Sequence, residues 1–280
     1  MKPLTLTVLI ATSIIIVAVF AIANMSSYRK YFPIESSTTH YNYSVEIAVI
    51  VDNYGYDDFA SEWGISVLLK IVNNENNWTI LFDTGSSDSV LKHNLYKLGY
   101  SISDIDFIVI SHEHFDHLGG LKAFSNMKLR VYVPKSMSDN AKEYIRNLGL
   151  KLIEVNETFE VVKNVYIVGE VYGPPWEQAL AINVDGKGLF IIVGCSHPGV
   201  EKIVKKAYRE IGVKPYAVLG GFHMAGASHY RIVHTVNELL ALGIKKIYPI
   251  HCSGDAIREY LRKNFPETYG NGHVGLVLKE

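Results

Sequence analysis

The chain has 280 residues, of which 48% are apolar and 20% are charged, and its formal net charge is −1. A chain of this length and apolar content can bury a sizeable core, which excludes a wholly disordered protein. The nearly balanced charge leaves no basic surplus to attract a polyanion, so we expect no nucleic acid among its partners. Two cysteines are too few for the disulfide framework of a small secreted domain.

The N-terminal part of the chain contains a long apolar run. Residues 4–23 are apolar apart from three threonines and one serine, and about twenty helical residues span the ~30 Å hydrocarbon core of a bilayer. We interpret residues 1–25 as a hydrophobic transmembrane helix, with a cleaved signal peptide as the alternative. Residues 26–41 are polar and aperiodic, which is typical of a spacer. Both alternatives predict a membrane-anchored or exported protein whose remaining residues lie outside the cytoplasm.

Residues 42–280 alternate between strand-like and helical patterns. Short runs rich in branched residues predict strands at 45–51, 65–72, 78–82, 107–110, 129–133, 165–168, 179–184, 189–193, 217–219 and 246–250. Amphipathic stretches predict helices at 87–98, 136–148, 199–211, 228–242 and 255–264. Strands in two groups, each followed by helices, predict one α/β domain: two mixed β-sheets packed face to face with helices on the outer faces, an αββα sandwich.

The strongest chemical signal directly follows a predicted strand and reads His112-Glu113-His114-Phe115-Asp116-His117. His112 and His114 leave the strand on the same side and can converge on one ion, because alternate side chains of an extended chain share a face. Asp116 and His117 follow in a turn, where they can face a second ion. Imidazole and carboxylate ligands suit zinc, iron or manganese, and a water between two such ions can be deprotonated near neutral pH.

This string resembles the signature of the metallo-β-lactamase superfamily, and the resemblance covers nearly all of residues 42–280. It implies the αββα fold, a mostly hydrolytic chemistry and two divalent metal ions, with zinc first and iron or manganese as alternatives. Asp83, in Phe82-Asp83-Thr84-Gly85 after a predicted strand, matches the early aspartate of the superfamily. The match implies that Asp83 supports the metal-binding loop through hydrogen bonds.

The resemblance also implies the later metal ligands. His197 would join His112 and His114, and His251 would join Asp116 and His117. The sequence departs from the superfamily at the bridging position, where an aspartate usually follows glycine at a strand end and where this chain has Gly194-Cys195. Three alternatives stay open: the Cys195 thiolate binds a metal, water alone forms the bridge, or His197 is the ligand while Cys195 packs beneath it.

Three further strings resemble a subgroup of the superfamily, namely Gly194-Cys195-Ser196-His197, Gly220-Gly221-Phe222-His223 and His251-Cys252-Ser253-Gly254. That subgroup includes the archaeal 7,8-dihydropterin-6-methyl-4-(β-D-ribofuranosyl)aminobenzene-5'-phosphate synthase, which joins a pterin to an arylamine with loss of diphosphate. His223 follows glycines that let a ligand approach the backbone closely, so it is a candidate catalytic residue that contacts a substrate oxygen or protonates a leaving group. Asp116 is the second catalytic candidate, because it can orient the nucleophile as well as bind metal.

The leading functional expectation is a metal-dependent hydrolase that cleaves an ester, phosphoester or amide of a small-molecule substrate. The alternative is a transferase of the synthase type, which the predicted export disfavours because pterin assembly is expected in the cytosol. The Asp83-Thr84-Gly85 string also resembles an aspartic protease loop, but the chain has no second such string. A scaffold without catalysis is disfavoured because every residue of the first metal motif is present.

Overall fold

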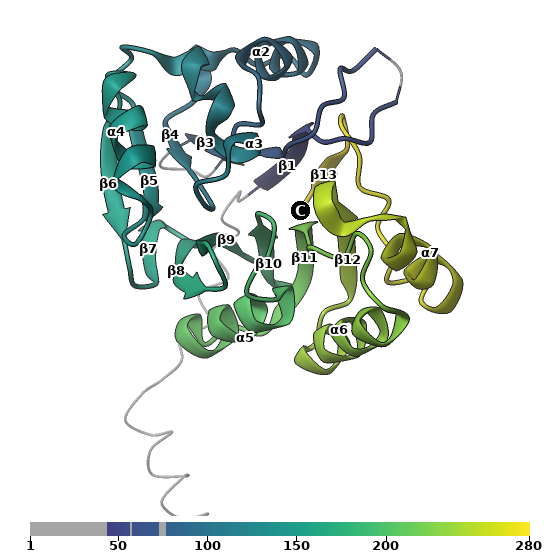
Figure 1. The fold of residues 1–280 in the computed structure, drawn as a ribbon. Coiled ribbons are helices and arrows are strands. Elements are labelled where there is room, and N and C mark those ends of the chain that lie inside the picture. The colour runs from purple at the N-terminus through teal and green to yellow at the C-terminus, as the bar shows by residue number, and fades with distance from the viewer. Residues whose placement is uncertain (1–43, 57, 73–76) are drawn as a thin grey trace, which may run out of the picture. The chain divides into compact units, whose positions relative to one another are not determined.

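The computed structural model describes residues 44–280 except 57 and 73–76. These residues form two mixed β-sheets that pack face to face, with helices on both outer faces (Figure 1). The layered arrangement agrees with the predicted αββα sandwich. The hydrophobic helix and the spacer predicted for residues 1–41 lie outside the described residues.

The first sheet has seven strands in the order β13-β1-β2-β3-β4-β5-β6. Neighbouring strands from β13 to β3 are antiparallel, whereas those from β3 to β6 are parallel. The strands are β1 (Ser44–Val51), β2 (Ser66–Val72), β3 (Asn77–Phe82), β4 (Phe107–Val109), β5 (Arg130–Pro134), β6 (Lys151–Val155) and β13 (Val277–Lys279).

The second sheet has six strands in the order β12-β11-β10-β9-β8-β7. It is parallel from β12 to β10 and antiparallel from β10 to β7. The strands are β7 (Phe159–Val162), β8 (Val165–Tyr172), β9 (Trp176–Val184), β10 (Gly188–Val193), β11 (Pro215–Gly221) and β12 (Lys246–Ile250). Each sheet therefore has one parallel part, and parallel strands place their carboxyl ends on a common edge.

The helices divide between the two outer faces. The first sheet is covered by α2 (Asp88–Lys97), α3 (Phe115–Leu118), η2 (Gly119–Phe124) and α4 (Asp139–Asn147), and η1 (Ile102–Asp104) precedes β4. The second sheet is covered by α5 (Val200–Ile211), α6 (His229–Leu242) and α7 (Asp255–Asn264). The short helix η3 (His251–Ser253) follows β12. Ser87, Ser138 and Ser228 cap the first backbone amides of α2, α4 and α6, which explains where these helices begin.

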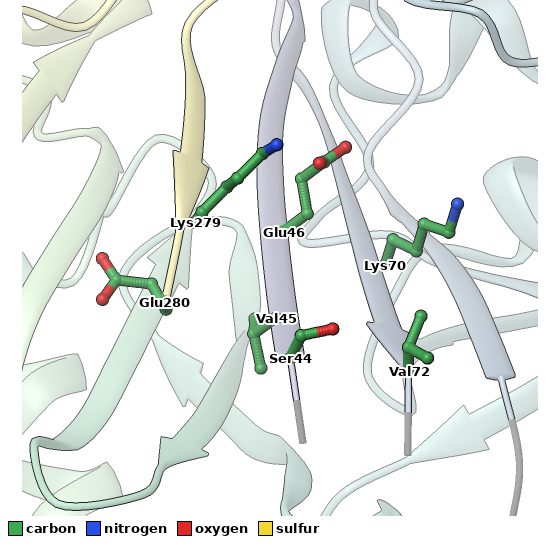
Figure 2. A pocket seen from close by; sticks show the side chains of 7 residues that line it. All are labelled: Ser44, Val45, Glu46, Lys70, Val72, Lys279 and Glu280. Atoms are coloured by element: carbon green, nitrogen blue, oxygen red, sulfur yellow. The ribbon is translucent and has the colours of Figure 1, made fainter. Parts of the chain in front are cut away.

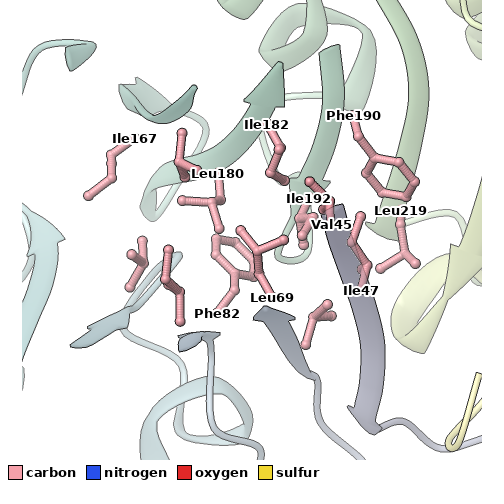
Figure 3. Packing of buried hydrophobic residues seen from close by; sticks show 14 of the residues in the cluster. Val45, Ile47, Leu69, Phe82, Ile167, Leu180, Ile182, Phe190, Ile192 and Leu219 are labelled. Carbon is pink, nitrogen blue, oxygen red and sulfur yellow. The ribbon is translucent and has the colours of Figure 1, made fainter. Parts of the chain in front are cut away.

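Strand periodicity decides which layer each apolar side chain joins. In β1, Val45 and Ile47 lie between the two sheets, whereas Ala48 and Ile50 face the helices. Figure 3 shows the layer between the sheets, in which Val45 and Ile47 meet Phe190 and other side chains of the second sheet. Because the strands at the centre of each sheet are covered on both faces, their sequences are nearly continuous apolar runs rather than alternating ones.

At the edge of the first sheet, the outer face becomes polar. Glu46 lies opposite Lys279 on β13 and Lys70 on β2 in the strand register. Figure 2 shows these three side chains on one side of the sheet, with Val45 pointing to the other. Tyr100 donates a hydrogen bond of 2.6 Å to Glu46 Oε1. This polar surface lies where β1 begins, whereas the catalytic candidates follow the strand ends.

One side chain connects the two sheets. The Gln178 amide of β9 donates to the carbonyl oxygens of Ile110 and Tyr132, at 2.9 and 3.1 Å, and Gln178 N donates to Ser111 O at 2.9 Å. These bonds fix β9 of the second sheet against the end of β4 in the first. The loop that follows β4, which carries the histidine string, is thereby held from both sheets.

The predicted elements agree with the structure except at the edges and in the histidine string. The edge strands β6, β7 and β13 were not predicted, because their residues are mostly exposed or half-buried and lack a clear apolar pattern. Asp116 and His117 lie in the short helix α3 rather than in a turn. Strand β9 begins at Trp176, earlier than predicted, and therefore includes Glu177.

The prediction of a membrane-anchored or exported protein, with the membrane as a partner, is corrected. Among the residues that the structure describes, no helix is both long and apolar enough to cross a membrane. The longest of them, α6, has 14 residues and a length of about 21 Å, which is shorter than the ~30 Å hydrocarbon core.

Candidate metal centre

The predicted site residues come together at one edge of the sandwich. They follow the carboxyl ends of parallel strands in both sheets: Asp83 follows β3, the histidine string follows β4, Cys195 and His197 follow β10, His223 follows β11, and His251 follows β12. Loops at this edge can therefore supply side chains from both sheets to one place.

The backbone at this edge is strained. Asp83, Ser196, His223 and His251 adopt positive φ values of 55°, 59°, 51° and 50°. Such conformations cost of order 1–3 kcal/mol each for residues other than glycine and cluster at functional sites. Four such residues, each within three positions of the end of a different strand, mark this edge as the candidate site.

One group of metal-binding atoms comes from Asp116, His117, Cys195 and His251, whose donor atoms all lie within 4.8 Å of one another. His251 Nε2 lies 3.2 Å from Asp116 Oδ2, and His117 Nε2 lies 3.2 Å from Cys195 Sγ. Cys195, His117 and His251 are buried. The predicted grouping of Asp116, His117 and His251 is therefore present, with the Cys195 sulfur added.

A second group consists of His112, Cys195 and His197, again within 4.8 Å. His114 lies outside this group in the described part of the chain, but its ring is 4.6 Å from the His112 ring and 4.9 Å from the His197 ring. His114 Nδ1 lies 3.0 Å from His112 Nε2. Cys195 belongs to both groups and thus occupies the place between them.

Two buried carboxylates orient the histidines of these groups. Asp83 Oδ2 lies 2.7 Å from His117 Nδ1 and accepts from Ser111 Oγ at 2.7 Å, and Asp83 Oδ1 accepts from Ser111 N at 2.6 Å. Glu177 Oε2 accepts from His197 N at 2.9 Å and lies 3.1 Å from His197 Nδ1. Each contact occupies Nδ1 and leaves Nε2 facing the site, as in carboxylate-oriented metal ligands.

A third buried carboxylate, Asp52, lies where β1 ends. Asp52 Oδ1 accepts from His251 N at 2.7 Å, and Asp52 Oδ2 has no hydrogen-bond partner among the described residues. Burial raises the pKa of Asp52 to about 6, although hydrogen bonds from the backbone amides of His251 and Asn53 oppose the rise. Neither Asp52 nor Glu177 was among the predicted site residues. The one available signal was the position of Asp52, an acidic residue directly after a predicted strand.

Burial and neighbouring charges set the protonation of the ligand atoms. Burial, reinforced by the surrounding imidazoles, holds the pKa of His112 well below its ordinary range, and burial likewise lowers the pKa of His114. Burial alone would raise the pKa of Asp116, but contacts with His251 and His117 outweigh it and lower the value to about 2. Neutral imidazoles and an ionised carboxylate are the forms that bind metal ions.

The donor sets fit divalent metal ions. Both ring nitrogens of His251 are buried and have no hydrogen-bond partner among the described residues, which is costly for polar atoms unless a ligand compensates. Imidazole, carboxylate and thiolate together are a donor set that zinc and iron accept. His223 lies at the exposed side of this centre, with its ring 4.6 Å from the His197 ring.

Comparisons with known proteins agree with this arrangement. The model of the metallo-beta-lactamase superfamily matches residues 67–199. The chain is 29% identical to the 7,8-dihydropterin-6-methyl-4-(β-D-ribofuranosyl)-aminobenzene-5'-phosphate synthase of Methanocaldococcus jannaschii, over 84% of this chain and 97% of the synthase. It is 30% identical to an uncharacterized protein of the same organism, over 83% of this chain and 99% of that protein.

A solved structure is also similar. The crystal structure of a metal-dependent hydrolase of the beta-lactamase superfamily, Tm1679, superposes with a TM-score of 0.69 at 25% sequence identity and covers 84% of this chain and 98% of its own. The predicted resemblance to the superfamily and to the archaeal synthase is confirmed. The chain belongs to the metallo-β-lactamase superfamily.

Proposed function

We propose that the chain is a metal-dependent hydrolase with a centre for two divalent ions. The observation that carries the proposal is the pair of donor groups that share Cys195: Asp116, His117 and His251 on one side, and His112 and His197 on the other. Zinc is the first candidate ion, with iron or manganese as alternatives, because these ions accept imidazole and carboxylate ligands.

In this proposal, His114 completes the second group after a small change of its side chain. Its ring already contacts those of His112 and His197. The Cys195 sulfur takes the place that an aspartate usually has in the superfamily, which favours the thiolate alternative over a bridge of water alone. When bound, the ions would polarise the substrate and lower the pKa of a water molecule.

The other residues then have distinct roles. Asp116 is ionised and lies between His251 and the solvent, with its side chain 20% exposed. It can therefore orient a nucleophile besides binding an ion. His223 is exposed at the rim and its pKa is raised, chiefly by a hydrogen bond with Cys252 against the opposing effect of burial. It can hold a proton for a substrate oxygen or a leaving group.

A second candidate function is supported by the sequence comparison. The archaeal synthase aligns over 97% of its own length, so a transferase that joins a pterin to an arylamine with loss of diphosphate has specific support. The predicted export disfavoured this alternative, and that prediction has been corrected. The hydrolase remains the leading proposal because the similar structure, Tm1679, is a metal-dependent hydrolase.

One experiment separates the two functions. The purified, metal-loaded protein is incubated in ¹⁸O-labelled water with phosphodiester, ester and amide substrates, and separately with a pterin diphosphate and an arylamine. A hydrolase places ¹⁸O in its product without any amine. Release of diphosphate that depends on the amine, with no ¹⁸O in the joined product, would replace the hydrolase with the transferase. Asp116→Asn should abolish either activity.

A further inference from the structure

A third group of donor atoms lies beside the two described above. It consists of Cys195 Sγ, Cys252 Sγ and a ring nitrogen of His223, all within 4.8 Å of one another. Cys195 and His223 lie in loops after β10 and β11, and Cys252 lies in η3 after β12. Cys195 and Cys252 are buried, with 4% and 6% of their surface exposed, whereas His223 is exposed and offers a route from solvent.

The loops that carry these donors are tightly fixed. Met224 N and Ala225 N both donate to Cys252 O, at 3.1 and 3.2 Å. Phe222 N donates to Ser253 Oγ at 3.0 Å. A Cβ atom on Gly221 would lie 2.7 Å from Cys252 Sγ. Only glycine therefore leaves room for this sulfur, and the donors are held in place before any ion arrives.

The chemistry of this third group differs from that of the first. The first group contains the carboxylate of Asp116, whereas the third contains two sulfurs and one imidazole and no carboxylate. Two thiolates with one imidazole select thiophilic cations with filled d shells, because soft donors bind these ions in preference to magnesium, calcium or manganese.

We propose that Cys195, Cys252 and His223 form a third cation site, which shares Cys195 with the other two groups and binds a thiophilic d¹⁰ cation, with Zn²⁺ as the natural ion and Cd²⁺ as a probe. Binding displaces the thiol protons into solvent and forms two metal–sulfur bonds and one metal–nitrogen bond. Because Cys195 belongs to all three groups, an ion in this site competes for the sulfur shared by the other two. The proposal does not depend on which reaction the chain catalyses.

The test uses the full chain, stripped of metal and titrated with Cd²⁺ while the ultraviolet charge-transfer absorption of cadmium–thiolate bonds is recorded. The chain has only two cysteines, so the whole signal comes from Cys195 and Cys252. Since each sulfur is a ligand, we expect Cys252→Ser and Cys195→Ser each to lose about half of the absorption at saturation, and the double variant to lose all of it.

Three further variants make the result independent of misfolding at Cys252. His223→Gln keeps both sulfurs and should raise the Cd²⁺ concentration at half-saturation at least about tenfold, whereas the matched variant His234→Gln, exposed on α6, should not change it. His251→Ala removes a donor of the first group only and should retain the absorption of both sulfurs.

An unchanged spectrum in Cys252→Ser, or an unchanged midpoint in His223→Gln, would overturn the proposal. In that case, loss of bound metal in His251→Ala would still support the two-ion centre. The opposite result is also possible: Asp116, His117 and His251 bind no ion, but the cadmium–thiolate absorption is present. That result would support the third site and contradict the proposed function.

Discussion

The layer between the two sheets and the edge where the strands end differ in which side chains they bury and in backbone conformation. Between the sheets, side chains such as Phe190, Ile182 and Leu180 are fully buried, apolar and in regular strands. At the edge, buried groups are ionisable, and the backbone of Asp83 and His251 has positive φ. The layer between the sheets stabilises the fold. The edge keeps its strained conformations only because that layer fixes the strands that lead to it.

This difference separates the residues that stabilise the fold from those that bind a ligand. A buried carboxylate or imidazole lowers stability unless hydrogen bonds or a ligand compensate for lost hydration. At the edge, Asp83 has such bonds, but His251 Nδ1 and Asp52 Oδ2 have none among the described residues. Substitutions between the sheets should therefore affect folding, whereas substitutions at the edge should affect ligand binding more than folding.

The largest effect is expected between the sheets, at Phe190. Phe190→Ala should lower the free energy of unfolding by about 3–5 kcal/mol, because it removes a buried ring and leaves a cavity. Urea denaturation of the metal-free protein measures this change. The control Phe190→Leu should lower it by less than about 1.5 kcal/mol. A loss below about 1 kcal/mol for alanine would show that this layer is not the main source of stability.

Glu177 tests whether a substitution at the edge lowers metal affinity without unfolding the protein. Glu177→Gln removes the negative charge beside His197, so metal affinity should fall about 10- to 100-fold while the protein stays folded. Competition with a chromogenic chelator measures the affinity. Glu170→Gln is the matched control, because Glu170 accepts hydrogen bonds from Ser136 on the surface. Equal affinities for the two variants would contradict an orienting role for Glu177.

Backbone strain at the edge should give a smaller difference in stability between two glycine variants. His223→Gly should leave the metal-free protein as stable or more stable, by up to about 1 kcal/mol, because glycine adopts a φ of 51° without strain. His234→Gly, within the exposed face of α6, should lower stability by about 0.5 kcal/mol. Thermal unfolding of the two variants compares them. A larger loss for His223→Gly would mean that its loop is not strained.

The smallest effect concerns Glu210, far from the centre. Burial raises its pKa, but hydrogen bonds from Thr158, Arg209 and Lys206 outweigh burial and lower it from 4.5 to about 2. The folded state therefore gains stability above pH 4.5, which is lost as the pH falls toward 2. Glu210→Gln should lower stability by about 0.5–1 kcal/mol at pH 7 and by nothing near pH 2. A pH-independent difference would contradict this electrostatic origin.

Much of the fold could be predicted because the central strands are long apolar runs and the helices begin at serine caps. Strands β10 and β12 and helix α7 agree with their predicted ranges to within one residue. The edge strands β6 and β13 could not be predicted, because strands exposed at an edge lose the apolar pattern that identifies a strand.

The candidate site was predictable where ligands are close in sequence. His112, His114, Asp116 and His117 form one string, and their convergence follows from a strand and a turn of helix. Cys195 was a predicted candidate, but its place between two donor groups depends on its contact with His117 of the other sheet's loop, 78 positions earlier in the chain. Asp52 contacts His251 across 199 positions, and no local pattern reveals such a contact.

The most direct test of the two-ion centre is the metal content per chain, measured by elemental analysis after reconstitution with zinc, iron or manganese. Three proteins are analysed: the Cys252→Ser background alone, and the same background with His112→Ala or with His251→Ala. The Cys252→Ser substitution keeps the third donor group from contributing. We predict about two ions per chain for the background and about one for each added substitution. Fewer than about half an ion per chain, unchanged by either substitution and by any of the three metals, would contradict the account.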